Sequence, residues 1–252
     1  MVLSALDVAI ILAAGFAAGF VNAIVGSGSL ITFPALLAVG YAPVAANVSN
    51  TVGMAFGNVS GVVGYRRELA GQRRRVIDYA IPSAAGGLVG GILLLALPQS
   101  VFHRVVPVLV LLAVVLVIIQ PRLSTFAARR LEGGRTTWAL GVVSVFLTAI
   151  YGGYFGAAQG VILMGLLPLF LKDDLQRLNA LKNVIAAIVN GVAAVLFALV
   201  AQVAWPAAGL LAVSSVAGGQ VGAAVGRRMP PNVLRAAIVI GGLAAVAKLV
   251  TS

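Results

Sequence analysis

The chain of 252 residues contains no cysteine, a single histidine and six acidic residues. Without cysteine it forms no disulfide and offers no thiolate for catalysis or metal binding. With His103 as its one imidazole, it has little from which to build a metal site or a histidine proton relay, so we expect neither a metal nor another cofactor. Six acidic residues also cannot supply the charged exterior that a water-soluble chain of this length needs.

Apolar sequence takes the place of the missing charge: 61% of the residues are hydrophobic and the mean hydropathy is +1.10. Runs such as 101–119 are long enough to cross the hydrocarbon part of a bilayer. We expect them to be helices, because bare strand edges are not stable in lipid. The net charge of +11 comes mostly from Lys and Arg in short loops between these runs. Membrane topology explains that pattern better than nucleic-acid binding does.

The sequence also repeats itself at an offset of 132 residues. The matched residues are Gly, Asn and Pro within apolar sequence, which compositional bias alone explains poorly. In membrane proteins, duplicated apolar segments interrupted by Gly at matching places point to a transporter whose site lies between the halves. The matched pairs are Gly28 and Gly160, Asn47 and Asn179, Asn58 and Asn190, Gly86 and Gly218, Gly87 and Gly219, Gly90 and Gly222, and Pro98 and Pro230.

Ten apolar segments are predicted to be helices, at 5–25, 29–39, 44–64, 76–97, 101–120, 136–156, 159–171, 176–199, 206–226 and 231–250. The second and seventh are too short to span at about 1.5 Å per residue, and each follows a break that contains glycine. We interpret them as the return arms of hairpins that bend within or near the membrane. The predicted fold is therefore an all-α integral membrane protein with two repeats, 1–120 and 136–252, joined by a cytoplasmic linker at 121–135. Each repeat has about five helical segments and opens with a broken or re-entrant helical hairpin.

Arginine-rich loops give the orientation. The loops at 66–75 and 122–135 are predicted to be cytoplasmic, because loops rich in Lys and Arg stay on that side of the membrane. The loop at 198–207, which corresponds to 66–75 by the repeat offset, carries no charge and is predicted to lie outside. Equivalent loops then face opposite sides. We therefore expect inverted repeats, with both termini on the outer face.

Polar residues gather near the two breaks and on the third and eighth segments. On the third segment Asn47, Asn50 and Asn58 share one helical face, and on the eighth Asn179, Lys182 and Asn183 share the equivalent face. These faces are predicted to meet near the middle of the membrane. The candidate substrate-binding residues are Asn22, Ser27, Gly28, Ser29, Asn47, Asn50, Thr51, Gln159, Gly160, Asn179, Lys182 and Asn183.

The chemistry of this set favours a small anion. It offers amide and hydroxyl donors, the ammonium of Lys182, and the N-termini of the helices that follow Gly28 and Gly160, where free N–H groups and the helix dipole attract negative charge. No acidic residue lies at the centre of a segment. Plainer interpretations stay open: the glycines serve close helix packing, single asparagines bond across helices, and Lys182 snorkels to the membrane edge. The segments carry no catalytic constellation, so we expect no enzyme.

Four stretches, at 26–37, 46–51, 61–67 and 173–183, resemble the sulfite exporter TauE/SafE family of membrane transporters. They read GSGSLITFPALL, ANVSNT, GVVGYRR and DDLQRLNALKN. The resemblance implies a secondary carrier, usually an exporter, for small sulfur-containing or organic anions such as sulfite, sulfoacetate or related sulfonates, in a bacterial inner membrane. The family's glycine-rich second break is weakened here by Ala157, Ala158 and Gln159.

Several alternatives remain beside this interpretation. A passive anion channel would share the polar faces, and saturable counter-transport would separate the two. An uptake carrier coupled to sodium or protons also fits. A purely structural or partner-binding membrane protein gives no reason for duplicated broken helices. The expected partners are the lipid bilayer and a small anionic substrate, with no nucleic acid, and the oligomeric state, including a homodimer, stays open.

Overall fold

The computed structural model of the protein describes residues 3–98, scattered positions between 100 and 119, and residues 135–225. The regular structure in these ranges is helical. Each helix begins and ends within three residues of a predicted segment. The fifth predicted segment lies largely, and the tenth wholly, outside the described residues. The helices are α1 (Ala5–Ile24), α2 (Ser29–Val39), α3 (Pro43–Gly64), α4 (Arg73–Ala96), α6 (Arg135–Tyr154), α7 (Gln159–Phe170), α8 (Leu175–Val200) and α9 (Trp205–Val225).

Local sequence explains several of these boundaries. Ser4 and Asp7 form a reciprocal capping box at the start of α1, which satisfies amides that have no partner within the helix. Pro43 occupies the first turn of α3, where its missing N–H costs nothing. Asp174 caps α8 by accepting from the amide of Gln176 at 2.8 Å. The predicted all-α architecture is confirmed for the described residues.

Five of the helices, α1, α4, α6, α8 and α9, are long and apolar enough to cross a membrane. Helix α3 has a similar length of 22 residues but is more polar. Helices α2 and α7 are short and apolar, as predicted. Large hydrophobic side chains cover much of the outer surface, including Phe16, Phe56, Ile81, Leu147 and Leu199. This arrangement, polar inside and apolar outside, suits a protein surrounded by lipid.

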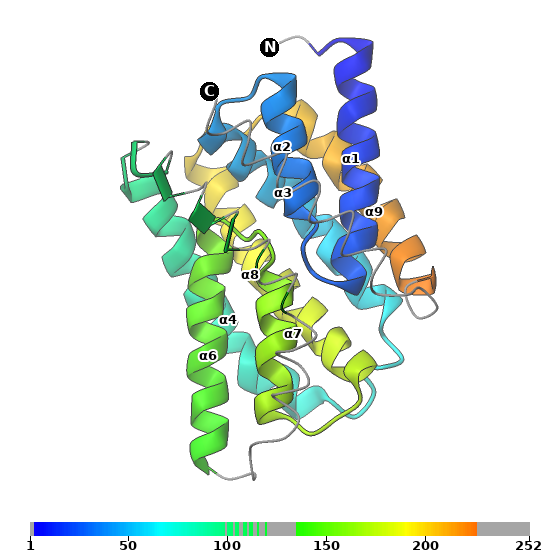
Figure 1. The fold of residues 1–252 in the computed structure, drawn as a ribbon, viewed down its shortest axis with the longest axis vertical. Coiled ribbons are helices and arrows are strands. Elements are labelled where there is room, and N and C mark those ends of the chain that lie inside the picture. Colours follow the sequence, from blue (N-terminus) through cyan, green and yellow to red (C-terminus); the bar gives the residue numbers. More distant parts are fainter. Residues whose placement is uncertain are drawn as a thin grey trace.

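The two helical hairpins, α1–α2 and α6–α7, enter from opposite ends of the molecule and turn back near its middle (Figure 1). Helix α1 packs along α9 and helix α6 packs along α4, while α3 contacts both α8 and α9. Each half thus places its opening helix against the last described helix of the other half. The two halves interlock and do not form separate bundles.

Glycines permit this close packing at matched positions. A Cβ on Gly86 of α4 would lie 2.5 Å from the carbonyl oxygen of Phe146 on α6, and one on Gly218 of α9 would lie 2.0 Å from that of Phe16 on α1. The close-packing interpretation of these glycines is therefore correct. Gly86 and Gly218 are 132 positions apart, whereas Phe16 and Phe146 are 130 apart. The offset between the two halves is therefore 130 residues in the opening helices α1 and α6, two fewer than the 132 residues between the matched glycines.

Candidate functional site

The two broken hairpins meet at their turns. Helix α1 ends two residues before Gly26, which has φ of +86°, and α6 ends two residues before Gly156, which has φ of +75°. Ala158, just before α7, is the described non-glycine residue with positive φ, at +59°. The amide of Gly160 donates to the carbonyl oxygen of Gly26 at 3.0 Å. The predicted breaks therefore exist and touch each other directly.

The amides of Gly28 and Gly160, at the starts of the two short helices, both have acceptors in this structure. Helix α2 begins at Ser29, and the amide of Gly28 donates to Oδ1 of Asn22 at 3.3 Å. Helix α7 begins at Gln159, as predicted, and the amide of Gly160 donates to the carbonyl oxygen of Gly26. At the first break the amide of Gly28 bonds to Asn22 of its own half, and at the second the amide of Gly160 bonds to the break of the other half. In this conformation neither amide is available to an anion.

Three donors from one face of α8 hold the end of α1. Nζ of Lys182 donates to the carbonyl oxygen of Asn22 at 3.0 Å, and the side-chain amides of Asn179 and Asn183 each donate to that of Ala23 at 3.2 Å. The last carbonyls of a helix lack partners within the helix, so α8 supplies them. The spacing of three and four residues puts all three side chains on the face that the sequence predicts.

Lys182 is fully buried, with none of its surface exposed. Its ammonium therefore does not snorkel to the membrane edge. In the described part of the chain, ion pairs join Asp173 to Arg75 and Arg177, and none involves Lys182. A lysine buried in a membrane protein with a neutral carbonyl as its hydrogen-bond partner is costly, and such residues usually serve a function.

The equivalent face of α3 repeats part of this arrangement. The side-chain amide of Asn47 donates to the carbonyl oxygen of Tyr154, at the end of α6, at 3.0 Å. Asn47 and Asn179 are matched by the repeat, and each donates to the last turn of the opening helix of the other half. Thr51 donates to the carbonyl oxygen of Asn47 at 3.0 Å.

The repeat partners Asn50 and Lys182 differ in what they contact. The side-chain amide of Asn50 donates to Oγ of Ser29 at 3.0 Å, and its Oδ1 accepts from the hydroxyl of Thr32 on the same helix, α2. Asn50 thus stays within its own half, whereas Lys182 crosses to α1. The break of α1 therefore receives the amino group of Lys182, whereas Asn50 sends no side-chain group to the break of α6.

Five buried side-chain atoms at this place have no hydrogen-bond partner among the described residues. They are Oγ of Ser27, Oδ1 of Asn47, Oδ1 of Asn179, and both Oε1 and Nε2 of Gln159. Ser27 and Gln159 are 132 positions apart, and so are Asn47 and Asn179. Buried polar atoms without partners are rare and cost about 1–3 kcal/mol each. Their occurrence as two repeat-related pairs sets this place apart from the rest of the interior.

Asn22 and Asn58 complete the polar interior. The side-chain amide of Asn22 donates to Oδ1 of Asn58, and Asn58 in turn donates to the carbonyl oxygen of Ala186 on α8 at 3.4 Å. Of the twelve predicted residues, all but Asn22 and Ser29 are buried, and those two are half-buried. A cavity of about 200 Å³ lies elsewhere, at the C-terminal ends of α3 and α9.

Spanning helices and two broken hairpins in contact, in the part of the chain that the structure describes, are the architecture of a multi-pass membrane protein of the transporter class. The chain belongs to the Sulfite exporter TauE/SafE family, whose profile matches residues 11–249. It is 28% identical over 242 residues to a "Probable membrane transporter protein" of Haemophilus influenzae, covering 96% of this chain and 94% of that one. It is 24% identical over 233 residues to "Probable membrane transporter protein YfcA" of Escherichia coli K12, covering 92% and 85% of the two chains. No solved structure matches the chain significantly.

Proposed function

We propose that the protein is a secondary transporter that exports small sulfur-containing or organic anions, such as sulfite, sulfoacetate or related sulfonates, across a bacterial inner membrane. In this proposal the two halves are inverted repeats, and the substrate binds where their breaks meet. Family membership supports the transporter class. The main support for this site is that buried polar atoms without partners occur in two repeat-related pairs of residues, Ser27 with Gln159 and Asn47 with Asn179.

The groups around the paired breaks support an anionic substrate. Lys182 brings a buried positive charge to the break of α1. Ser27 and Nε2 of Gln159 add donors without partners. Among the described residues, no three Asp, Glu, His or Cys side chains lie together in a way that could hold a metal ion. None of the twelve candidate residues is acidic, so an oxyanion bound among them would find donors and Lys182 and no carboxylate of the set.

Outward transport agrees with the membrane potential. Moving one elementary charge across a potential of 100 mV changes its energy by about 2.3 kcal/mol. An inside-negative potential therefore drives an anion out of the cell without a coupled ion. Export by anion uniport is the simplest mechanism for such a site.

A second candidate function is anion uptake coupled to sodium. The atoms of Asn47 and Asn179 that lack partners are oxygens, which accept hydrogen bonds or bind cations but cannot donate to an anion. Carbonyl oxygens at the ends of broken helices hold sodium ions in other transporters. Sodium dependence of anion binding would therefore favour uptake over uniport export.

A thermal-shift screen of the purified protein tests the proposal. Sulfite, sulfate, sulfonates and small carboxylates are compared with and without sodium, because a ligand of the folded state raises the free energy of unfolding by about 2.7 kcal/mol at a hundred times its Kd. We expect one of these anions to raise the melting temperature of the wild type and of Ser214→Ala, a control on α9. We expect Ser27→Ala to lose most of the shift.

Two results would contradict the proposal. A shift that survives unchanged in Ser27→Ala and Asn47→Ala would place the site elsewhere. In liposomes, anion flux that neither saturates nor shows counter-transport would indicate a passive channel.

A further inference from the structure

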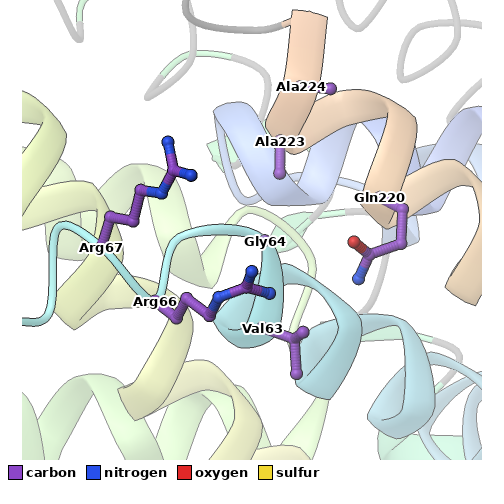
Figure 2. Close-up of a pocket in the computed structure, with 7 residues that line it drawn as sticks. All are labelled: Val63, Gly64, Arg66, Arg67, Gln220, Ala223 and Ala224. Carbon is purple, nitrogen blue, oxygen red and sulfur yellow. The ribbon is translucent and has the colours of Figure 1, made fainter.

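The cavity at the C-terminal ends of α3 and α9 combines two arginines with small and apolar residues. Its volume is about 200 Å³. In Figure 2 the side chains of Arg66 and Gln220 extend toward each other from opposite sides of it. No carboxylate from the described residues lines it. The lining includes Val63 and Gly64 at the end of α3, Arg66 and Arg67 in the turn that follows, and Gln220 and Ala223 on α9.

The packing of α3 against α9 creates this space. A Cβ on Gly64 would lie 2.3 Å from that of Ala223, so glycine is what allows the helices to meet just below the cavity. The side-chain amide of Gln220 donates to both the carbonyl oxygen and the hydroxyl of Ser60, at 2.9 Å each. One wall of the cavity is therefore fixed by hydrogen bonds between the helices.

The two arginines keep their charge available. The guanidinium groups of Arg66 and Arg67 form no hydrogen bond or ion pair with any described residue, and both residues are exposed. Arg75 and Arg177, by contrast, are both paired with Asp173. A planar guanidinium with free N–H groups matches the oxygen atoms of a phosphate.

An apolar stripe on α3 leads up to the arginines. Phe56, Val59 and Val63 are 56%, 55% and 45% exposed, and their spacing of three and four residues puts them on one face of the helix. The stripe ends at Val63, which lines the cavity. On a membrane helix such an exposed apolar face lies against lipid tails, and the arginines follow at the level of the predicted cytoplasmic surface.

We propose that this cavity binds the phosphate group of an anionic phospholipid, whose acyl chain lies along the stripe of Phe56, Val59 and Val63. Basic pockets between membrane helices on the cytoplasmic side are suited to such headgroups. This lipid site is separate from the paired breaks, and the proposal does not depend on which anion the protein transports. The bound lipid would fasten α3 to α9, which belong to different halves.

Native mass spectrometry of the full-length protein, released from micelles that contain phosphatidylglycerol and phosphatidylcholine, tests the proposal. We expect the wild type to retain phosphatidylglycerol. Because each arginine near the surface contributes about 1 kcal/mol of attraction, the double variant Arg66→Gln/Arg67→Gln should bind it at least about tenfold more weakly. The matched control, Arg73→Gln/Arg74→Gln, removes two exposed charges from the start of α4, close in sequence but outside the cavity, and should retain the lipid.

Further measurements distinguish a site for a lipid from a site for a free oxyanion. Val59→Ser should weaken retention of long-chain phosphatidylglycerol and leave the binding of a short-chain form unchanged. If both arginine double variants lost phosphatidylglycerol binding to the same extent, the proposal would be overturned, because the loss would then reflect only the surface potential. Displacement of the lipid by millimolar inorganic phosphate would overturn it in favour of a site for free phosphate. Unchanged melting temperatures without added lipid would show that the variants are folded.

Discussion

Gly26 and Gly160 lie in direct contact between the two halves of the protein. The amide of Gly160 donates to the carbonyl oxygen of Gly26 at 3.0 Å, and a Cβ on either residue would lie 2.4 Å from the Cα of the other. Gly26 also has a positive φ, which favours glycine. This contact fixes one hairpin turn against the other and brings the surrounding polar side chains together.

We expect Gly160→Ala to lower the free energy of unfolding by roughly 1–3 kcal/mol, because the added methyl group has no space and forces the two turns apart. Thermal unfolding in detergent measures the loss. Gly209→Ala is the matched control: it lies inside α9 with no atom within 4 Å of the new methyl group. It should be neutral or stabilising by up to about 1 kcal/mol. Equal melting temperatures for the two variants would show that the turns do not need the contact.

The sequence predicted the helices well because the signals are local. Apolar runs, proline and glycine positions fixed the described boundaries to within three residues. The spacing of Asn179, Lys182 and Asn183 also placed them correctly on one face of α8. These predictions depend only on helix geometry and on the need to satisfy the backbone in lipid.

What the sequence did not predict depends on tertiary contacts. Nothing in the chain indicates that the amides of Gly28 and Gly160 are already bonded, or that Asn50 bonds to α2 while its repeat partner Lys182 bonds to α1. Gly160 and Lys182 donate to backbone carbonyls, which every residue has, and Gly28 and Asn50 donate to side-chain oxygens that only the tertiary fold brings within reach. The shift of two residues between α1 and α6 is likewise visible only in their packing.

The predicted topology can be tested with single cysteines, because the chain has none of its own. We expect Ala70→Cys, in the arginine-rich turn before α4, to react with a membrane-impermeant reagent only after the cells are opened. Gln202→Cys, in the uncharged turn before α9, should react in intact cells. Both positions are exposed. Gln72 is unsuitable, because its buried side chain donates to the carbonyl oxygen of Arg177 at 2.9 Å. Labelling with the opposite pattern would reverse the assigned orientation.

The ion pairs of Asp173 lead to a prediction about the stability of the protein at acidic pH. It is paired with Arg75 at the start of α4 and with Arg177 at 2.9 Å in α8. Partial desolvation acts to raise the pKa of Asp173, but hydrogen bonds from Arg75, from the amide of Asp174 and from Arg177 outweigh it and hold this pKa below its ordinary value.

Because the folded pKa is the lower one, the stabilisation is complete above the unfolded pKa of about 3.9. It is lost as the pH falls through the folded value. We expect the melting temperature of the wild type to drop in that acidic window by more than that of Asp173→Asn. Melting curves of the two proteins between neutral pH and this window make the comparison. Parallel curves would show that the ion pairs contribute nothing.

The anion hypothesis depends most on Lys182. Its ammonium is fully buried and bonds to the carbonyl oxygen of Asn22 at 3.0 Å, whereas its repeat partner Asn50 offers only a neutral amide. A hydrogen bond to a charged group contributes about 1.5–3 kcal/mol and a neutral one about 1 kcal/mol. Lys182→Met should therefore weaken anion binding by at least about tenfold, Lys182→Arg should retain part of it, and Asn50→Ala should be milder.

The measurement is anion affinity by thermal shift or calorimetry on protein that melts cooperatively without ligand. Lys182→Met loses a hydrogen bond but also removes the cost of burying an ammonium group. Because these two effects offset each other, we expect the variant to stay folded, and its melting temperature without anion checks this. Equal anion affinity in wild type and Lys182→Met would mean that the lysine only fastens α8 to the end of α1. The anion would then have to be held by neutral donors such as Ser27 and Gln159. A loss of affinity in Lys182→Met with partial recovery in Lys182→Arg would instead place the positive charge at the bound anion, because Arg keeps the charge and changes its shape.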